Sequence, residues 1–176
     1  MLSRFFKPVV QIPMVRLGSE RDGGYYVPKK IIKISKKIIS CGLGEDWSFE
    51  EAFIKLNKNI EISFYDHTVG FLFWFKHSFK AFYFFLRYGA NFKNIYKYFF
   101  YLKFLKNKKI KHLKFKISQR NNENNKEISL SNILKFEKNL ILKIDIEGDE
   151  YKVLKHIITH QKKINCLIIE FHQINK

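Results

Sequence analysis

Five short strand candidates, of which 113–117 alternates apolar residues with lysine, are the feature that most constrains the fold of this chain. They occupy residues 36–42, 60–66, 113–117, 140–146 and 166–171. Runs of this length suit β-strands better than helices. Most of them are separated by segments with helical spacing or by polar stretches, and such alternation is typical of a parallel sheet covered by helices on both faces. The sequence therefore predicts an α/β fold, in which ligands bind at the carboxyl ends of the strands.

Two segments between these runs have helical signals. Ser48 and Glu51 have the spacing of a capping box, and the apolar residues after Ser48 keep helical spacing. A second helix is expected after the fourth run, with Asp149 and Glu150 in its first turn, where carboxylates interact favourably with the helix dipole. Both helices are predicted to begin just after a strand ends, and therefore beside the expected ligand edge.

Half of the carboxylates of the chain are crowded into two patches that follow strand ends. The formal net charge is +17, and eight of the 16 acidic residues lie within 45–51 and 145–150. Independent helix caps account for part of this crowding. They do not account for Asp145 and Glu147, which in extended chain would point to the same side. Such an edge would repel a pyrophosphate, and it suits a cationic ligand such as S-adenosylmethionine, which carries a sulfonium and an ammonium.

A glycine turn follows the first predicted strand. Gly42 and Gly44 permit a tight turn and close approach of a ligand to the backbone, and Asp66 closes the next strand 22 residues after Gly44. In nucleotide-binding sheets an acid at about this distance accepts hydrogen bonds from ribose hydroxyls. A GxG alone is compatible with a plain turn, but its pairing with Asp66 favours a ligand that contains a ribose.

Five blocks of the sequence resemble, in order, those of FkbM-type methyltransferases and related methyltransferase-like proteins. They are ERDGGYYVP (20–28), IISCGLGEDWSFEE (38–51), FYDHTVG (64–70), ILKIDIEGDEYKVL (141–154) and LIIEFH (167–172). The resemblance covers most of the chain outside about 71–112. It implies a Rossmann-like class I methyltransferase fold that lacks its last two strands, with S-adenosylmethionine as the cofactor. The implied reaction is methylation of a hydroxyl on a sugar or related small molecule.

The resemblance also implies roles for individual residues. Expected cofactor contacts are Ser40, Gly42, Gly44, Asp46, Asp66 and Asp145, although Ser40 and Asp46 stand where the family usually has an acid and a third glycine. Expected acceptor contacts are Asp22, Gly23, Gly24 and His67. Apart from the resemblance, Asp145, Glu147, His67 and His172 are candidate catalytic bases because they all end or follow strands; we expect Asp145 or Glu147 to act in positioning and His172 as the base.

Two alternatives remain open at these positions. His67 and His172 are also compatible with solvated loop histidines. Asp145 and Glu147 could instead hold a divalent cation, but two carboxylates alone make a weak site and the spacing of a calcium loop is absent. No metal is therefore expected.

The segment from 71 to about 110 interleaves aromatic and basic residues. Lys76, Lys80 and Arg87 have the spacing of one helical stripe, and Phe, Trp, Tyr and Leu dominate the rest. Core packing of a helical insert is the first expectation. The second is peripheral contact with an anionic membrane, and dimerisation, an acceptor-pocket wall and RNA stacking are further alternatives. Specific nucleic-acid binding is not expected because arginine-rich blocks are absent, and the sequence leaves the oligomeric state undetermined.

The organisation expected for the whole chain is a single domain over 1–176 with this insert. Cys41 and Cys166 lie in apolar runs without metal-type spacing, which predicts reduced thiols in a cytoplasmic protein. No stretch of 18 residues is free of charge, so a membrane-spanning helix is not expected. Because the chain stops just after the fifth run, the alternative function is a truncated, non-catalytic methyltransferase-like protein that binds a partner or a membrane.

Overall fold

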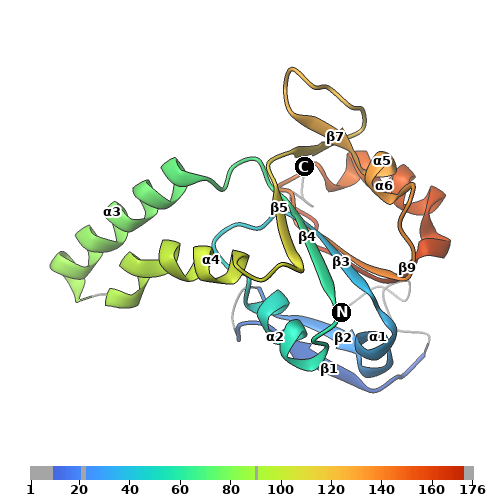
Figure 1. Ribbon diagram of the computed structural model, residues 1–176, viewed down its shortest axis with the longest axis horizontal. Helices are drawn as coiled ribbons and strands as arrows, with labels where there is room; N and C mark the ends of the chain where they lie inside the picture. The colour runs from blue at the N-terminus through green and yellow to red at the C-terminus, as the bar shows by residue number, and fades with distance from the viewer. Residues whose placement is uncertain (1–9, 21–22, 90, 173–176) are drawn as a thin grey trace, which may run out of the picture.

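Four of the five predicted strands, together with a strand at residues 110–113, form a parallel sheet of five strands (Figure 1). The computed structural model describes residues 10–20, 23–89 and 91–172. Across the sheet the strands are β5 (Ile110–Leu113), β4 (Glu61–Tyr65), β3 (Lys37–Cys41), β8 (Leu140–Ile144) and β9 (Ile164–Ile169). The prediction of an α/β fold with a parallel sheet and flanking helices is confirmed.

The central strand, β3, explains why the apolar runs are continuous. It pairs in parallel with β4 on one side and with β8 on the other. Its neighbouring residues Ile38 and Ile39 are both fully buried, and they belong to the separate cores on the two faces of the sheet. A strand covered on both faces needs apolar residues at successive positions rather than at alternate ones.

Two layers cover the faces of the sheet (Figure 1). One layer contains α2 (Ser48–Leu56) and α1 (Lys29–Ile34), together with the hairpin of β1 (Met14–Leu17) and β2 (Tyr25–Pro28). The other contains α5 (Leu130–Leu134) and α6 (Glu150–Thr159), which a short 3₁₀ turn, η3 (Gln161–Lys163), connects to β9. The β1–β2 hairpin was not predicted from the sequence.

The strand order places a topological switch point between β3 and β8. The chain moves outward from β3 to β4 and β5, and then returns to the other side of β3 to form β8 and β9. In open parallel sheets the crevice for a ligand lies where the strand order reverses, outside the carboxyl ends of the strands. Gly42 and Asp145 follow these two strands directly.

The segment between β4 and β5 forms a helical hairpin that projects from the body (Figure 1). It contains α3 (Phe71–Tyr88), a 3₁₀ turn, η2 (Phe92–Tyr96), and α4 (Lys97–Leu105). We call residues 71–105 the aromatic arm. Trp74 and Tyr101 anchor it in the core against Trp47. Among the described residues, no helix combines the length and apolarity needed to cross a membrane.

The third predicted strand, 113–117, is wrong in its position. The sheet strand ends at Leu113, where the N–H of Phe115 donates to the Leu113 carbonyl and turns the chain. Residues beyond this turn form β6 (Lys116–Ser118), which pairs with β7 (Glu127–Ser129) outside the main sheet. The alternating apolar and lysine residues are compatible with either strand, so the pattern alone did not reveal the turn.

The predicted capping box is also wrong. Ser48 is the first residue of α2, and its hydroxyl accepts a hydrogen bond from the N–H of Ser19 at 2.8 Å. The N–H of Ser48 donates instead to Asp46 Oδ1 at 2.8 Å. The Glu51 carboxylate accepts from the indole N–H of Trp47 at 2.9 Å and does not reach back to Ser48. Tertiary contact with the loop before β2 therefore replaces the local cap.

Candidate functional site

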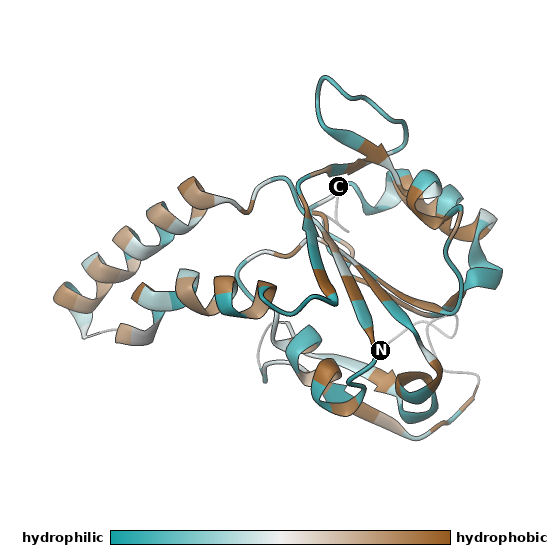
Figure 2. Ribbon diagram, in the orientation of Figure 1, coloured by the Kyte–Doolittle hydropathy of each residue, from teal (hydrophilic) through white to brown (hydrophobic). Residues whose placement is uncertain are grey.

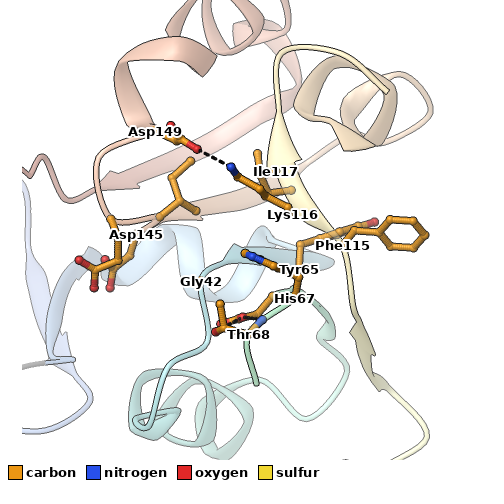
Figure 3. Close-up of a pocket in the computed structure, with 12 residues that line it drawn as sticks. Gly42, Tyr65, His67, Thr68, Phe115, Lys116, Ile117, Asp145 and Asp149 are labelled. Atoms are coloured by element: carbon orange, nitrogen blue, oxygen red, sulfur yellow. Dashed lines mark hydrogen bonds and ion pairs between the residues drawn. The ribbon is translucent and has the colours of Figure 1, made fainter. Parts of the chain in front are cut away.

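A cavity of about 490 Å³ opens at the carboxyl ends of β3, β4 and β8. This volume lies within the roughly 300–1,000 Å³ of small-molecule sites. Seven residues expected at the site line it: Gly23, Gly42, Gly44, Asp46, Asp66, Asp145 and Glu147. A smaller hollow of about 130 Å³ shares four of them and adds His67 (Figure 3). The structure thus brings together segments that lie far apart in the sequence.

The wall of the larger cavity has a charge opposite to that of the chain. Five carboxylates line it, from Glu45, Asp46, Asp66, Asp145 and Glu147. Among the described residues that line it, Lys143 is the single basic one. The cavity is therefore acidic within a protein whose formal net charge is +17.

Gly42 allows the ends of β3 and β8 to lie against each other. Its φ is +87°, and a Cβ at this position would lie 1.7 Å from the carbonyl oxygen of Asp145. The N–H of Asp145 in turn donates to the Cys41 carbonyl at 2.9 Å. No other residue fits here, because a side chain would collide with backbone and the dihedral is in the region that favours glycine.

Asp66 holds the glycine turn in place. Its Oδ2 accepts from the N–H groups of Leu43 at 2.8 Å and Gly44 at 3.2 Å. Its Oδ1 accepts from the N–H and hydroxyl of Thr68 and from the N–H of Val69. Burial opposes ionisation, yet these hydrogen bonds bring the pKa of Asp66 below its usual value. With five donors around two oxygens, the ribose contact predicted for Asp66 would require a donor to leave.

Asp46 connects the start of α2 to the loop before β2. Burial would raise its pKa, but hydrogen bonds from the hydroxyl and N–H of Ser48 lower it. A Cβ on Gly23 would lie 2.7 Å from Asp46 Oδ2, so the absence of a side chain there lets the loop approach. Gly24 is similarly tight, since its Cβ would lie 2.1 Å from the Ser19 carbonyl oxygen, and it lines neither cavity.

Ser40 supports the cavity from below rather than lining it. It is fully buried, and its hydroxyl donates to Glu50 Oε1 at 2.8 Å. Lys143 Nζ lies 3.8 Å from the same oxygen and 5.2 Å from the centre of the Tyr25 ring. Ser40 lines neither cavity, so the direct cofactor contact predicted for it is not supported. Glu50 and Lys143 form a buried ion pair whose cation borders the cavity.

One residue in the sequence is a signal for this ion pair. Lys143 lies in the middle of the apolar run LILKIDI, and a lysine is almost never fully buried unless it is paired. Its partner, Glu50, lies on a different element and could not be identified from spacing.

A buried carboxylate orients His172, which lines neither cavity itself but lies beside Asp145 and Glu147, two residues that line both. Glu150 has no exposed surface, and its Oε1 accepts from the N–H groups of Ile146 and Gly148, both at 3.1 Å. The same oxygen lies 2.9 Å from His172 Nδ1. Burial opposes the ionisation of Glu150, but these hydrogen bonds lower its pKa. Glu150 was expected only as a helix-end carboxylate, and its contact with His172 was not predicted.

The second nitrogen of His172 lies between the two predicted catalytic carboxylates. His172 Nε2 is 3.7 Å from Asp145 Oδ1 and 3.7 Å from Glu147 Oε2. The hydrogen bond to Glu150, and then the charge of Glu147, raise the pKa of His172. Burial raises the pKa of Asp145, and the cation of Lys143 opposes this effect. The structure therefore brings the three predicted catalytic residues together.

This cluster can bind either a proton or a cation. His172 Nε2 is available to accept a proton, while Nδ1 is held by Glu150. Asp145, Glu147 and His172 also each offer a ligand atom within 4.8 Å of the others, so the cluster could hold a divalent ion. Sequence spacing predicts only the two carboxylates here, and therefore no metal, because it does not place His172 beside them.

The remaining predicted contacts lie near the smaller hollow or outside the described residues. His67 is exposed and lines this hollow, beside Lys116 and Asp149, whose charges are 3.5 Å apart (Figure 3). Asp22 lies outside the described residues. Cys41 and Cys166 are both free thiols, and burial raises the pKa of Cys41 to about 12.

Comparisons of this chain with protein-family models, with curated proteins and with solved structures gave no match. Any functional assignment depends on the residue pattern and on the geometry of the cavity.

Proposed function

We propose that this chain is an S-adenosylmethionine-dependent methyltransferase that methylates a hydroxyl group of a sugar or related small molecule. The observation that carries the proposal is the charge of the larger cavity, which has five carboxylates and one lysine in its wall. A sulfonium ligand with an amino-acid group matches this arrangement, because it presents two positive centres and one carboxylate.

The position of the cavity supports the same proposal. The sheet order, taken by rank along the chain, is 3-2-1-4-5, and the cavity lies at its switch point. Blocks that resemble FkbM-type methyltransferases contribute the glycine turn at Gly42 and Gly44 and the rim at Asp145 and Glu147. We infer a class I methyltransferase fold from this agreement between sequence blocks and strand order.

The residues of the cavity fit the cofactor in chemistry. Lys143 offers a positive charge for the carboxylate of the methionine part, and Asp145 and Glu147 offer negative charges for its ammonium and sulfonium. A Cβ at Gly44 would meet nothing within 4 Å, so space is open above the turn. Asp66 acts indirectly, by fixing the backbone of that turn.

Held by Lys143, Asp145 and Glu147, S-adenosylmethionine would supply an electrophilic methyl group to a hydroxyl oxygen of the acceptor, with the sulfur as the leaving group that keeps the electron pair. His172 Nε2 accepts the proton of the acceptor hydroxyl. Glu150 holds Nδ1 and stabilises the imidazolium that results, as an orienting carboxylate does in a catalytic triad. Asp145 and Glu147 add negative charge on the other side of Nε2.

Isothermal titration with S-adenosylmethionine tests the cofactor part of this proposal. We expect Asp145→Asn to weaken binding about tenfold or more, since a hydrogen bond to a charged group contributes about 1.5–3 kcal/mol. Glu61→Gln is the matched control, because this exposed carboxylate begins β4 at the opposite end of the sheet. The proposal would be overturned if Asp145→Asn and Glu61→Gln bound S-adenosylmethionine with equal affinity, or if the wild-type protein did not bind it.

The role of His172 is tested by turnover. Formation of S-adenosylhomocysteine is measured with a panel of sugars as acceptors, with and without a metal chelator. We expect His172→Gln to keep the cofactor affinity and to lower turnover by about 10²–10⁴-fold, the usual contribution of a general base. Turnover that requires an added divalent ion, or that survives the substitution, would contradict the role of proton acceptor.

A further inference from the structure

The outer face of α3 carries a continuous apolar stripe that the protein leaves uncovered. The stripe comprises Leu72, Phe75, Phe79, Phe82 and Leu86, at intervals of three and four residues. Their exposed fractions are 70%, 61%, 71%, 47% and 67%. Figure 2 shows the apolar character of the arm where it extends from the sheet. Core packing, the first expectation for this segment, is therefore wrong for most of its aromatic residues.

The exposure of the stripe does not come from a loosely attached helix. Trp74, on the inner face of α3, is 1% exposed and packs against Tyr101 of α4. The hydroxyl of Ser78 donates to the Ile95 carbonyl at 3.0 Å, and the rings of Phe85 and Phe92 are 5.0 Å apart. The inner face thus fixes the orientation of α3, and the stripe necessarily points away from the protein.

Positive charge accompanies the stripe, and the arm itself carries no carboxylate, although Glu45 of the body lies 3.6 Å from His77 and 4.0 Å from Lys97. Lys76, Lys80 and Arg87 are exposed on α3 beside the stripe, at the spacing of one face of a helix. The sequence has no Asp or Glu between residues 67 and 122. A rigid amphipathic helix with aromatic residues on one side and cations beside them has the composition of helices that lie in the interface of an anionic bilayer.

We propose that the aromatic arm is a docking surface for an anionic lipid bilayer, with α3 lying in the interfacial plane. The apolar stripe enters the boundary between headgroups and acyl chains, and the cations of α3 contact the anionic headgroups. This docking is peripheral and depends on no property of the cavity, so it stands independently of the proposed methyl transfer.

Two other occupants fit the observations less well. A second copy could pair through the stripe, since its spacing matches a coiled coil, but the stripe covers only about two heptads. The partner arm would also bring its own cations and no acidic residue to pair with them. Single-stranded nucleic acid would use separate aromatic faces along a basic groove, whereas the side chains here form one convex helical face.

Co-sedimentation with vesicles tests the docking. The full chain is mixed with vesicles of phosphatidylcholine alone, or of phosphatidylcholine and phosphatidylglycerol at a ratio of about 3:1, at low and at high salt. We expect binding to the mixed vesicles, weak or no binding to neutral ones, and loss of binding at high salt, because surface charge is screened over a few ångströms near 1 M salt.

Matched variants separate the two parts of the surface. Phe75→Ser with Phe79→Ser should abolish binding, whereas Phe136→Ser with Ile158→Ser, two residues that are 83% and 65% exposed outside the arm, should leave it unchanged. Lys76→Gln, Lys80→Gln and Arg87→Gln together should weaken binding by roughly fivefold for each cation. Lys30→Gln, Lys138→Gln and Lys155→Gln together make the same change in net charge at exposed sites elsewhere, and should have a smaller effect.

Circular dichroism is used to check that each variant is folded. Two results would contradict the proposal. Equal binding by the arm variants and their controls would show that net charge alone attracts the protein. Absence of vesicle binding would overturn the proposal of bilayer docking. In that case, a dimer that dissociates in the variant with Phe75→Ser and Phe79→Ser would identify a second copy as the occupant. A complex with single-stranded RNA that the same variant loses would identify nucleic acid.

Discussion

Glu150→Gln isolates the contribution of the buried carboxylate that orients His172. Three hydrogen bonds converge on Glu150 Oε1, from Ile146 and Gly148 at 3.1 Å and from His172 Nδ1 at 2.9 Å. A glutamine can keep the two backbone bonds through its amide oxygen. The bond to His172 changes from charge-assisted, about 1.5–3 kcal/mol, to neutral, about 0.5–1.5 kcal/mol. We therefore expect a loss of about 1–2 kcal/mol in the free energy of unfolding.

The pH dependence of this loss has a definite sign on both sides. The pKa of Glu150 is lowered from 4.5 in the folded protein, so its contribution is complete above pH 4.5 and is lost as pH falls through the folded-state value. The pKa of His172 is raised from 6.5, so its contribution is complete below pH 6.5 and is lost as pH rises through the folded-state value. The difference between the wild-type protein and Glu150→Gln should be largest between pH 4.5 and 6.5.

Urea unfolding of both proteins across this pH range measures the difference, and NMR titration of the His172 ring follows its pKa directly. We expect the His172 pKa to fall in Glu150→Gln. Glu147→Gln is the comparison and should lower the His172 pKa less, because the Glu147 side chain is 85% exposed and its oxygen is 3.7 Å from Nε2 rather than hydrogen-bonded. A stability difference that does not change between pH 4 and 8 would refute the assignment of a charged pair.

Three further single substitutions and one double variant test the backbone and the charges beneath the cavity. Gly42→Ala should prevent the ends of β3 and β8 from meeting and should abolish cofactor binding. Gly44→Ala should lower the free energy of unfolding, measured with urea, by about 1–2 kcal/mol, because the φ of +56° is strained for alanine although the space around it is open. Lys143→Met should destabilise the fold by about 3–5 kcal/mol by leaving Glu50 buried without its cation, and Lys143→Met with Glu50→Gln should recover most of this loss; a double variant no more stable than the single one would contradict the ion pair.

Most of the central sheet could be predicted from the sequence because a strand that is buried on both faces has apolar residues at neighbouring positions. In β3 and β8, neighbouring apolar residues such as Ile38 and Ile39 are buried in the cores on opposite faces, and Gly42, Asp66 and Asp145 mark the ends of β3, β4 and β8. The edge strand β5 was misplaced because one of its faces is less covered and its pattern continues past the turn at Phe115. The β1–β2 hairpin was missed because each strand has only four residues, too few for a period to show.

The cavity could be predicted for a similar reason, whereas the side-chain network around it could not. Residues at strand ends converge in any parallel sheet, so their meeting follows from topology. The partners that orient them lie at separations that no motif encodes: Ser40 and Glu50 are 10 residues apart, and Glu150 and His172 are 22 apart. Such contacts depend on how α2 and α6 pack on the sheet, and the spacing of residues in the sequence does not predict that packing.

The four carboxylates of the segment DIEGDE are tolerated because the fold gives them different environments. Asp149 is neutralised by two lysines, with Lys152 Nζ at 2.5 Å and Lys116 Nζ at 3.5 Å, which lowers its pKa. Glu150 points into the protein and is stabilised by backbone N–H groups and by His172. Asp145 and Glu147 are left facing a single imidazole, with an excess of negative charge at the mouth of the cavity. Solvent screens the exposed Glu147, so the cost of this excess falls mainly on the partly buried Asp145, whose pKa burial raises, and a positively charged ligand would offset it there.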